Sequence, residues 1–281
     1  MVKASYWMLV TLLSFSLMAI AVKELSINLN TSEIIFFRSL VSLIIIIPIV
    51  SYFGFKKTVS RNIGKHITRN FAHFLGQYGW VYGIAFIPMA EVFALEFTVP
   101  IWTALIATIL LNEKMSKSRI LAIVFGVLGV IVILRPGIEI IHIASIAVLF
   151  GALSYGLSHT LTKSLVKSDS PLSIIFYMTI IQLPIALILS FENWTIPNGV
   201  MWFWIVITGL SGLIAHYCMA KALMFADAMV IVPMDFLRLP LIMVVGLVFY
   251  SENIEWFVLV GALLMLIGNF VNLKNENKVL G

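Results

Sequence analysis

The sequence predicts an all-α polytopic membrane protein with ten transmembrane helices, arranged as an inverted repeat of five plus five. Three observations indicate this fold: 61% of the 281 residues are hydrophobic and only 11% are charged, the apolar runs are continuous, and the two halves of the chain align with each other. Soluble domains have about 45–50% apolar and about 25% charged residues. The composition therefore excludes a water-soluble enzyme and a disordered chain, and continuous runs argue against a β-barrel.

The lengths of the apolar runs give the helices. A helix needs about 20 residues to cross about 30 Å of hydrocarbon, because each residue adds 1.5 Å. Charged and polar interruptions divide the chain into ten such segments with short connections, which leaves no room for a domain outside the membrane. In order, we expect helices near residues 5–22, 32–53, 67–87, 90–111, 119–134, 142–163, 171–190, 200–224, 228–250 and 255–273.

The Lys and Arg residues predict the orientation, because cationic loops stay on the cytoplasmic side. With the N-terminus inside, the outer loops hold only Lys23 and Arg135, while Arg38 and Arg238 lie within spans. We therefore expect cytoplasmic termini in a bacterial inner membrane, and the net charge of +5 does not indicate nucleic-acid binding. The inner segments hold the other cations: Lys3, Lys56, Lys57, Arg61, Lys65, Arg69, Lys114, Lys117, Arg119, Lys163, Lys167, Lys221, Lys274 and Lys278.

The two halves align at an offset of 139–140 residues, which predicts one repeat over 1–139 and a second over 140–281. Each half has an odd number of spans, so the second half crosses the membrane in the opposite sense. Inverted repeats are typical of secondary transporters, which bind substrate near the membrane midplane. A scaffold without transport is the alternative. The matches pair Leu13-Ser14-Phe15 with Leu153-Ser154-Tyr155, Lys23 with Lys163, Ile34–Phe37 with Ile174–Tyr177, Gln77-Tyr78 with His216-Tyr217, Phe86 with Phe225, Pro100 with Pro240, Glu113 with Glu252, and Gly129 with Gly268.

Two acids stand at equivalent places in the repeat. Glu96 precedes Pro100 by four residues, and Asp235 precedes Pro240 by five. A proline removes a backbone donor and breaks the helix near the acid, and Pro233 adds a second break in the ninth span. A charge at a helix centre costs at least about 2.5–3.5 kcal/mol, so it needs a partner, water or a ligand. We expect Glu96 and Asp235 to line a central cavity from opposite halves.

Two arginines also lie within spans. Arg38 and Arg238 are candidates to bind a substrate carboxylate or to balance the acids, because a guanidinium matches a carboxylate in geometry. The alternatives are a helix-end packing role for Arg38 and pairing of Arg238 with Asp235 three residues before it.

The remaining candidates are a stripe of polar and aromatic residues in the third span, the repeat equivalent of Gln77 in the second half, and two aromatic residues near Glu96. Polar-tipped aromatics suit a cavity for a partly planar or zwitterionic ligand, although they also form interfacial belts. His73 and His159 are more often packed polar residues than proton carriers, and the glycines at 126, 129, 261 and 268 suit close helix packing. The candidates for binding are Gln77, Tyr78, Tyr82, Trp102 and Phe97 in the first half and His216 in the second.

The sequence contains no motif for metal binding, nucleotide binding or catalysis. The sequence has no Cys/His cluster with metal-ligand spacing and no P-loop, so we expect no catalytic residues, no metal and no cofactor. An enzyme acting on lipids remains an alternative class, although no nucleophile or acid/base pair for it stands out.

Several short motifs between Arg69 and Gly137 together resemble those of a known family. They are Arg69-Asn70, Tyr82-Gly83-Ile84-Ala85, Ile87-Pro88-Met89-Ala90-Glu91, Phe97-Thr98-Val99-Pro100, Leu111-Asn112-Glu113, Gly126-Val127-Leu128-Gly129 and Leu134-Arg135-Pro136-Gly137. They resemble EamA-type members of the drug/metabolite transporter superfamily, and Pro240, Glu252 and Gly261 echo them in the second half.

The resemblance implies ten helices, cytoplasmic termini and alternating access for small polar metabolites. The chain is most similar to alphaproteobacterial members linked to uptake of S-adenosylmethionine or riboflavin. We therefore expect a carrier of an amino-acid-derived or nucleoside-like compound, zwitterionic or cationic, in contact with the lipid bilayer. A coupled proton or counter-substrate is compatible with the embedded acids. Export of amino acids or toxic amphiphiles is the alternative within transport. Met178 stands where a second Arg38 would lie, so the halves differ, which suits an asymmetric ligand.

Overall fold

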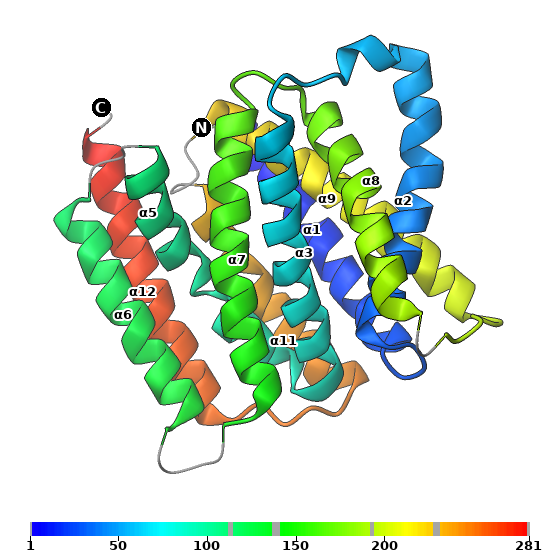
Figure 1. Ribbon diagram of the computed structural model, residues 1–281. Coiled ribbons are helices and arrows are strands. Elements are labelled where there is room, and N and C mark those ends of the chain that lie inside the picture. Colours follow the sequence, from blue (N-terminus) through cyan, green and yellow to red (C-terminus); the bar gives the residue numbers. More distant parts are fainter. Residues whose placement is uncertain (1, 112–114, 137–140, 192–193, 227–230, 280–281) are drawn as a thin grey trace.

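The computed structural model describes residues 2–111, 115–136, 141–191, 194–226 and 231–279, and this part of the chain is a bundle of helices (Figure 1). The all-α prediction is confirmed. The elements are α1 (Val2–Leu25), α2 (Thr31–Phe53), η1 (Phe55–Lys57), α3 (Ile63–Phe86), α4 (Met89–Glu96), α5 (Val99–Leu110), α6 (Lys117–Leu134), α7 (Ile143–Leu165), α8 (Pro171–Ser190), α9 (Met201–Phe225), η2 (Val232–Leu237), α11 (Arg238–Phe249) and α12 (Trp256–Val279).

The helices follow the expected spans closely. Seven of those in the described residues are long and apolar enough to cross a membrane when α4 and α5 are taken together, and α11 and the first part of α12 are shorter apolar helices. α3 is less apolar because it carries Lys65, Arg69 and several other polar residues. Since α1 begins and α12 ends at the same end of the bundle (Figure 1), we call this end the inner end and the opposite one the outer end, following the charge-based orientation.

The fourth and ninth expected spans are broken, as the prolines predict. Residues 90–111 form two helices, α4 and α5, which meet at Phe97 and Thr98. Pro100 lies in the first turn of α5, where its missing N–H costs no hydrogen bond. The described part of the ninth span contains the 3₁₀ helix η2, which includes Pro233, and continues as α11, with Pro240 in its first turn. The side chain of Pro233 lies outside the described residues.

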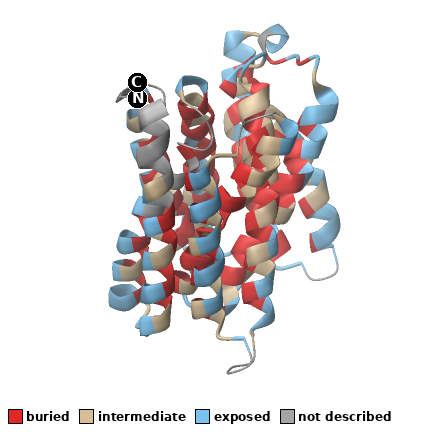
Figure 2. Cartoon of the chain, turned by 90° about the vertical axis from the view of Figure 1, so that its left-hand side faces the viewer, coloured by how far each residue is buried: buried red, intermediate tan, exposed pale blue. Residues whose placement is uncertain are grey.

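The surface of the bundle is apolar and much of the polar side-chain surface is inside, the reverse of a soluble protein. Leu, Ile, Val and Phe residues on the outward faces are exposed, for example Ile44, Ile109 and Phe249, while Arg38 and Arg69 are both 3% exposed. Figure 2 shows the buried residues in the interior of the bundle and the exposed ones on its outward faces. This distribution suits lipid as the surrounding solvent.

The packing of the helices follows the inverted repeat. The repeat makes α1 equivalent to α7 and α3 equivalent to α9. The contact of α1 with α9 is therefore the counterpart of the contact of α3 with α7, and both are extensive. Two further major pairs, α2 with α8 and α6 with α12, each join a helix to its own equivalent. A two-fold relation between the halves requires this pattern, in which each contact either has a counterpart or joins two equivalent helices.

Glycines allow two of these pairs to touch through their backbones. A Cβ on Gly129 would lie 2.7 Å from the carbonyl oxygen of Gly261, and a Cβ on Gly261 would lie equally close to that of Gly129. The predicted packing role of these two residues is confirmed. Gly126 packs against Ile101 and Gly268 against Ala122, so the other two glycines also serve close contacts.

The α3–α7 contact depends on Gly79, and this makes a testable prediction. A Cβ at Gly79 would lie 2.2 Å from the carbonyl oxygen of Ala147, so Gly79→Ala forces the helices apart. We expect a loss of about 1–3 kcal/mol of stability, the usual cost of overpacking, and a lower melting temperature in detergent. Gly64→Ala on the same helix is the matched control, because nothing lies within 4 Å of its added methyl group. Equal melting temperatures for the two variants would contradict this account.

Candidate substrate-binding site

Two acids and an arginine meet where the broken spans of the two halves face each other. Arg238, the first residue of α11, donates from Nη2 to Glu96 Oε1 at 3.2 Å and also pairs with Asp235 of η2. Both acids therefore contact one guanidinium, and the pairing of Asp235 with Arg238 is confirmed. With both acids ionised, the formal charges are two negative and one positive, so the group then has a formal net charge of −1.

Aromatic side chains hold this group in place. Trp80 Nε1 donates to Glu96 Oε2 at 3.1 Å. The guanidinium carbon of Arg238 lies 4.9 Å from the ring centre of Phe15 and 5.0 Å from that of Phe93, which are cation–π distances. Asp235 Oδ1 is buried and has no hydrogen-bond donor among the described residues. One acceptor of the group is thus free for a ligand or for water.

Two narrow, adjoining cavities open beside these charges. Their walls come from both halves, including Phe15 and its repeat equivalent Tyr155. The residues shared by both cavities are Glu96, His159, Met219, Asp235 and Arg238; Phe15, Met18, Trp80, Tyr155 and His216 line the first cavity, and Phe97, Val99 and Pro100 the second.

A buried polar cluster continues from the cavities between α2, α3, α7, α8 and α9. His73 Nδ1 lies 2.8 Å from Gln182 Nε2, and the rings of His73 and His216 are 4.5 Å apart. Arg69 donates to Thr162 Oγ1 at 3.1 Å and to Asn70 Oδ1 at 2.6 Å. These contacts connect the inner half of α3 to the cavity.

The predicted site residues separate into groups. Glu96, Asp235, Arg238, His216 and Phe97 line the cavities. Arg38 is buried and does not line the cavities, and the buried Gln77 does not line them either. Trp102 packs on Gly156 of α7 instead.

Tyr78 and Tyr82 lie elsewhere, in a pocket at the outer end beside Ser26 and Asn30. The reason is helical periodicity. His73, Gln77 and Trp80 are spaced at i, i+4 and i+7, so they share the buried face of α3. Tyr78 and Tyr82 share a different face with each other, four residues apart.

Several residues that contribute here were not among the predicted binding residues. Trp80 and Tyr155 line the first cavity. Arg69, which we assigned to the inner cations, is a buried member of the polar cluster. The signals were present in the sequence: Tyr155 is the repeat equivalent of Phe15, and Arg69 begins the Arg69-Asn70 motif.

A network of charged groups bridges several elements at the outer end of the bundle. Lys23 Nζ forms an ion pair with Glu252 at 3.0 Å and donates to the carbonyl oxygen of Ile84 at 3.1 Å. Glu252 Oε2 in turn accepts from the backbone N–H of Met89 at 2.8 Å. The network joins the end of α1, the α3–α4 corner and the connection before α12. Lys23, which we assigned to an outer loop, thus lies in the last turn of α1 and bridges three elements.

The repeat equivalent of Lys23 makes a similar contact at the inner end. Lys163 Nζ donates to the carbonyl oxygens of Leu223 at 3.0 Å and Ala226 at 2.9 Å, at the end of α9. Nearby, Asp169 lies 2.8 Å from His66 Nε2 and joins the α7–α8 connection to α3. Charged side chains therefore connect the halves at both ends.

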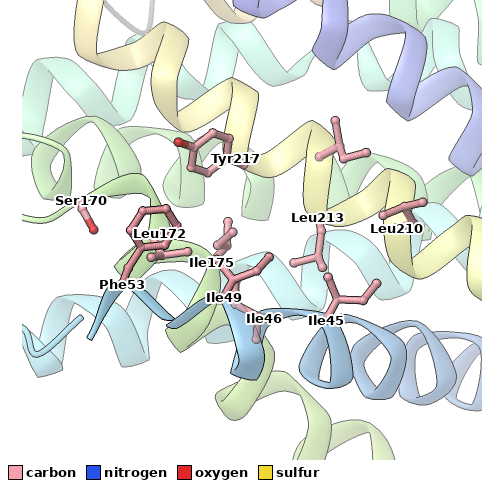
Figure 3. Close-up of a pocket in the computed structure, with 11 residues that line it drawn as sticks. Ile45, Ile46, Ile49, Phe53, Ser170, Leu172, Ile175, Leu210, Leu213 and Tyr217 are labelled. Carbon is pink, nitrogen blue, oxygen red and sulfur yellow. The ribbon is translucent and has the colours of Figure 1, made fainter. Parts of the chain in front are cut away.

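A larger groove lies between α2, α8 and α9, and it has a different chemistry. Figure 3 shows Ile46, Ile175 and Leu213 facing one another across it, with Tyr217 at one side. Its lining is apolar apart from Ser170 and the Tyr217 hydroxyl. This groove suits lipid chains, whereas the charged cavities suit a polar metabolite.

A family model matches the chain twice. The EamA-like transporter family matches residues 2–135 and again residues 142–274. The chain belongs to the EamA-like transporter family. It is therefore a multi-pass membrane protein, and its family membership indicates a transporter.

Similar proteins match along most of their length. An S-adenosylmethionine uptake transporter of Rickettsia felis is 26% identical over 274 residues, which cover 98% of this chain and 93% of that protein. A riboflavin transporter of Rhizobium johnstonii is 27% identical over 279 residues, with 98% and 92% covered. A riboflavin transporter of Vibrio cholerae is 26% identical over 249 residues, with 87% and 84% covered. A solved crystal structure has the same fold, with a TM-score of 0.74, 12% identity and 99% of each chain covered.

Proposed function

We propose that this EamA-like protein is a secondary transporter that takes up a small polar metabolite by alternating access across a bacterial inner membrane. The observation that carries the proposal is the meeting of Glu96, Asp235 and Arg238 at breaks in spans from opposite halves. Broken helices at a repeat interface are where secondary transporters bind substrate. Its two repeats span 1–139 and 140–281, and both termini face the cytoplasm.

The substrate class follows from the cavity and the relatives. A net negative group beside Phe15, Trp80 and Tyr155 favours a compound with a cationic part and a planar part. The names of the relatives, S-adenosylmethionine uptake transporter and riboflavin transporter, fit an amino-acid-derived or nucleoside-like cargo. The cavities are narrow in this state, so loading requires the helices around them to separate.

The membrane potential sets the energetics of uptake. At about 100 mV one elementary charge is worth about 2.3 kcal/mol, or a concentration ratio of roughly 50. A cationic cargo accumulates inside without a coupled ion, whereas a neutral one requires a proton or a counter-substrate. Uptake driven by an imposed potential without proton entry into the vesicles would indicate a cationic cargo, whereas uptake accompanied by proton entry would indicate proton coupling.

Flux into proteoliposomes tests the proposed function. We expect purified protein to admit labelled S-adenosylmethionine or riboflavin well above empty vesicles, with saturation and with competition by unlabelled compound. A preference for inside-out vesicles would support export instead. If neither compound enters and neither raises the melting temperature in detergent, this substrate class is wrong, because a ligand at 100 times its Kd stabilises by about 2.7 kcal/mol.

A further inference from the structure

Arg38 is a buried cation with unused donors. It lies in the second turn of α2 and is 3% exposed. Its Nε and Nη1 atoms are buried and have no hydrogen-bond acceptor among the described residues. A guanidinium stays protonated in proteins, and a buried charge without a partner is costly. Such a group therefore indicates a missing anion.

The fold makes room for this side chain beside the cavity. A Cβ on Gly212 of α9 would lie 2.8 Å from Arg38 Nε and 3.4 Å from Met18 Sδ, so a glycine is needed where α9 passes the guanidinium. Met18 lines the first cavity. Arg38 is also close enough to Tyr155 and His216, two further lining residues, to interact with them electrostatically. The guanidinium thus lies close to residues that line the first cavity.

The two arginines in the centre of the molecule are not equivalent. Arg238 already contacts two carboxylates, Glu96 and Asp235. Arg38 forms no ion pair with a carboxylate in the described part of the chain, and neither does Arg69, whose donors are used by Thr162 and Asn70. The cavity wall therefore holds two acids for one arginine, and Arg38 beside this wall has free cationic donors.

We propose that Arg38 binds the carboxylate of a zwitterionic cargo whose cationic group faces Glu96 and Asp235. The inference rests on the proposed function and narrows its substrate class to compounds that carry a carboxylate and a separate cation, such as amino-acid-derived sulfonium or amine compounds. S-Adenosylmethionine has both groups, whereas riboflavin has neither. The cargo anion supplies the acceptor that Arg38 lacks, and charge-assisted hydrogen bonds of this kind are the strong ones.

The test compares S-adenosylmethionine with its decarboxylated analogue, which keeps the sulfonium, the amine and the nucleoside. Binding to purified full-length protein is measured by calorimetry, and uptake is measured in proteoliposomes. We expect the wild-type protein to prefer the carboxylated compound by at least about tenfold. The Arg38→Gln variant should bind and transport the two compounds about equally, because only the carboxylated compound loses its contact with Arg38. Arg69→Gln is the matched control, since it removes an equally buried charge whose donors are already used, and it should keep the preference.

The outcomes separate the two proposals. If the wild-type protein moves none of these compounds and no riboflavin, the proposed function fails. If it moves them but shows no preference for the carboxylate, or if Arg38→Gln keeps the preference, the Arg38 inference fails while transport stands. Transport of riboflavin alone also overturns the inference. The wild-type comparison needs no variant, so the proposal stays testable if Arg38→Gln fails to fold.

Discussion

Glu96→Gln is expected to lower the uptake of a cationic cargo by about ten- to a hundredfold, because charge-assisted hydrogen bonds contribute about 1.5–3 kcal/mol. Glutamine keeps the shape of the side chain and an acceptor for Trp80 Nε1, which now donates to Glu96 at 3.1 Å. Removing one carboxylate also changes the net charge of the group around Arg238 from −1 to zero. The attraction for a cation then falls while the packing stays.

Initial uptake rates in proteoliposomes measure this effect. Glu91→Gln is the matched control, because Glu91 lies on the same helix but accepts from Ser145 at 2.7 Å and does not line the cavities. It should leave uptake within about twofold of the wild-type rate, since effects of this size amount to only a few tenths of a kcal/mol. Asp235→Asn should behave like Glu96→Gln. Unchanged uptake in both cavity variants, with normal melting temperatures, would remove these acids from the binding site.

Glu252→Gln should open the outer end of the protein more often. The substitution keeps an acceptor for the Met89 N–H but removes the ion pair with Lys23, whose atoms lie 3.0 Å apart. The side chains of Lys23 and Glu252 are 21% and 10% exposed, so the pair is largely shielded from water. Losing it should cost the closed form about 1–2 kcal/mol, between the values for surface and buried pairs.

A cysteine at the outer end reports this opening. Ile87 is 7% exposed at the end of α3, so Ile87→Cys in a Cys218→Ser background should react slowly with a membrane-impermeant maleimide. Adding Glu252→Gln should raise the labelling rate by about tenfold, as 1.4 kcal/mol predicts. Glu255→Gln is the control, because Glu255 pairs with Arg135 beside α12 and not with α1. Equal labelling in the two variants would show that the Lys23 ion pair does not hold this end closed.

Much of the fold followed from the sequence because lipid imposes simple rules. A helix must be apolar along about 20 residues, so the hydropathy runs gave the seventh span at residues 171–190, the same bounds as α8. The prolines predicted the breaks after Glu96 and before Arg238. The repeat predicted that acids from opposite halves meet, and the structure brings Glu96 and Asp235 to one guanidinium.

The burial of individual side chains, and the side of a helix on which they act, were harder to predict. Arg69 lies close to the inner end of α3, where a cation is ordinarily solvated, but here it is buried and contacts Thr162 of α7, which packs against α3. Tyr78 follows Gln77 directly in the sequence, yet Gln77 is buried and Tyr78 lines the outer pocket, because successive residues in a helix are about 100° apart. The role of Glu252 depends on contacts with residues more than 160 positions away, which composition and spacing do not reveal.

The paired glycines of α6 and α12 have a mechanical consequence. At Gly129 and Gly261 the two helices touch through their backbones, so no layer of side chains lies between them that could rearrange to let one helix slide past the other. We therefore expect α6 and α12 to move together as one unit, and bending to occur at residues 97–98 and 237–238, where the two broken spans change helix. Changes that tune the speed of turnover therefore belong at these two places, whereas changes in the α6–α12 unit alter whether the protein assembles at all.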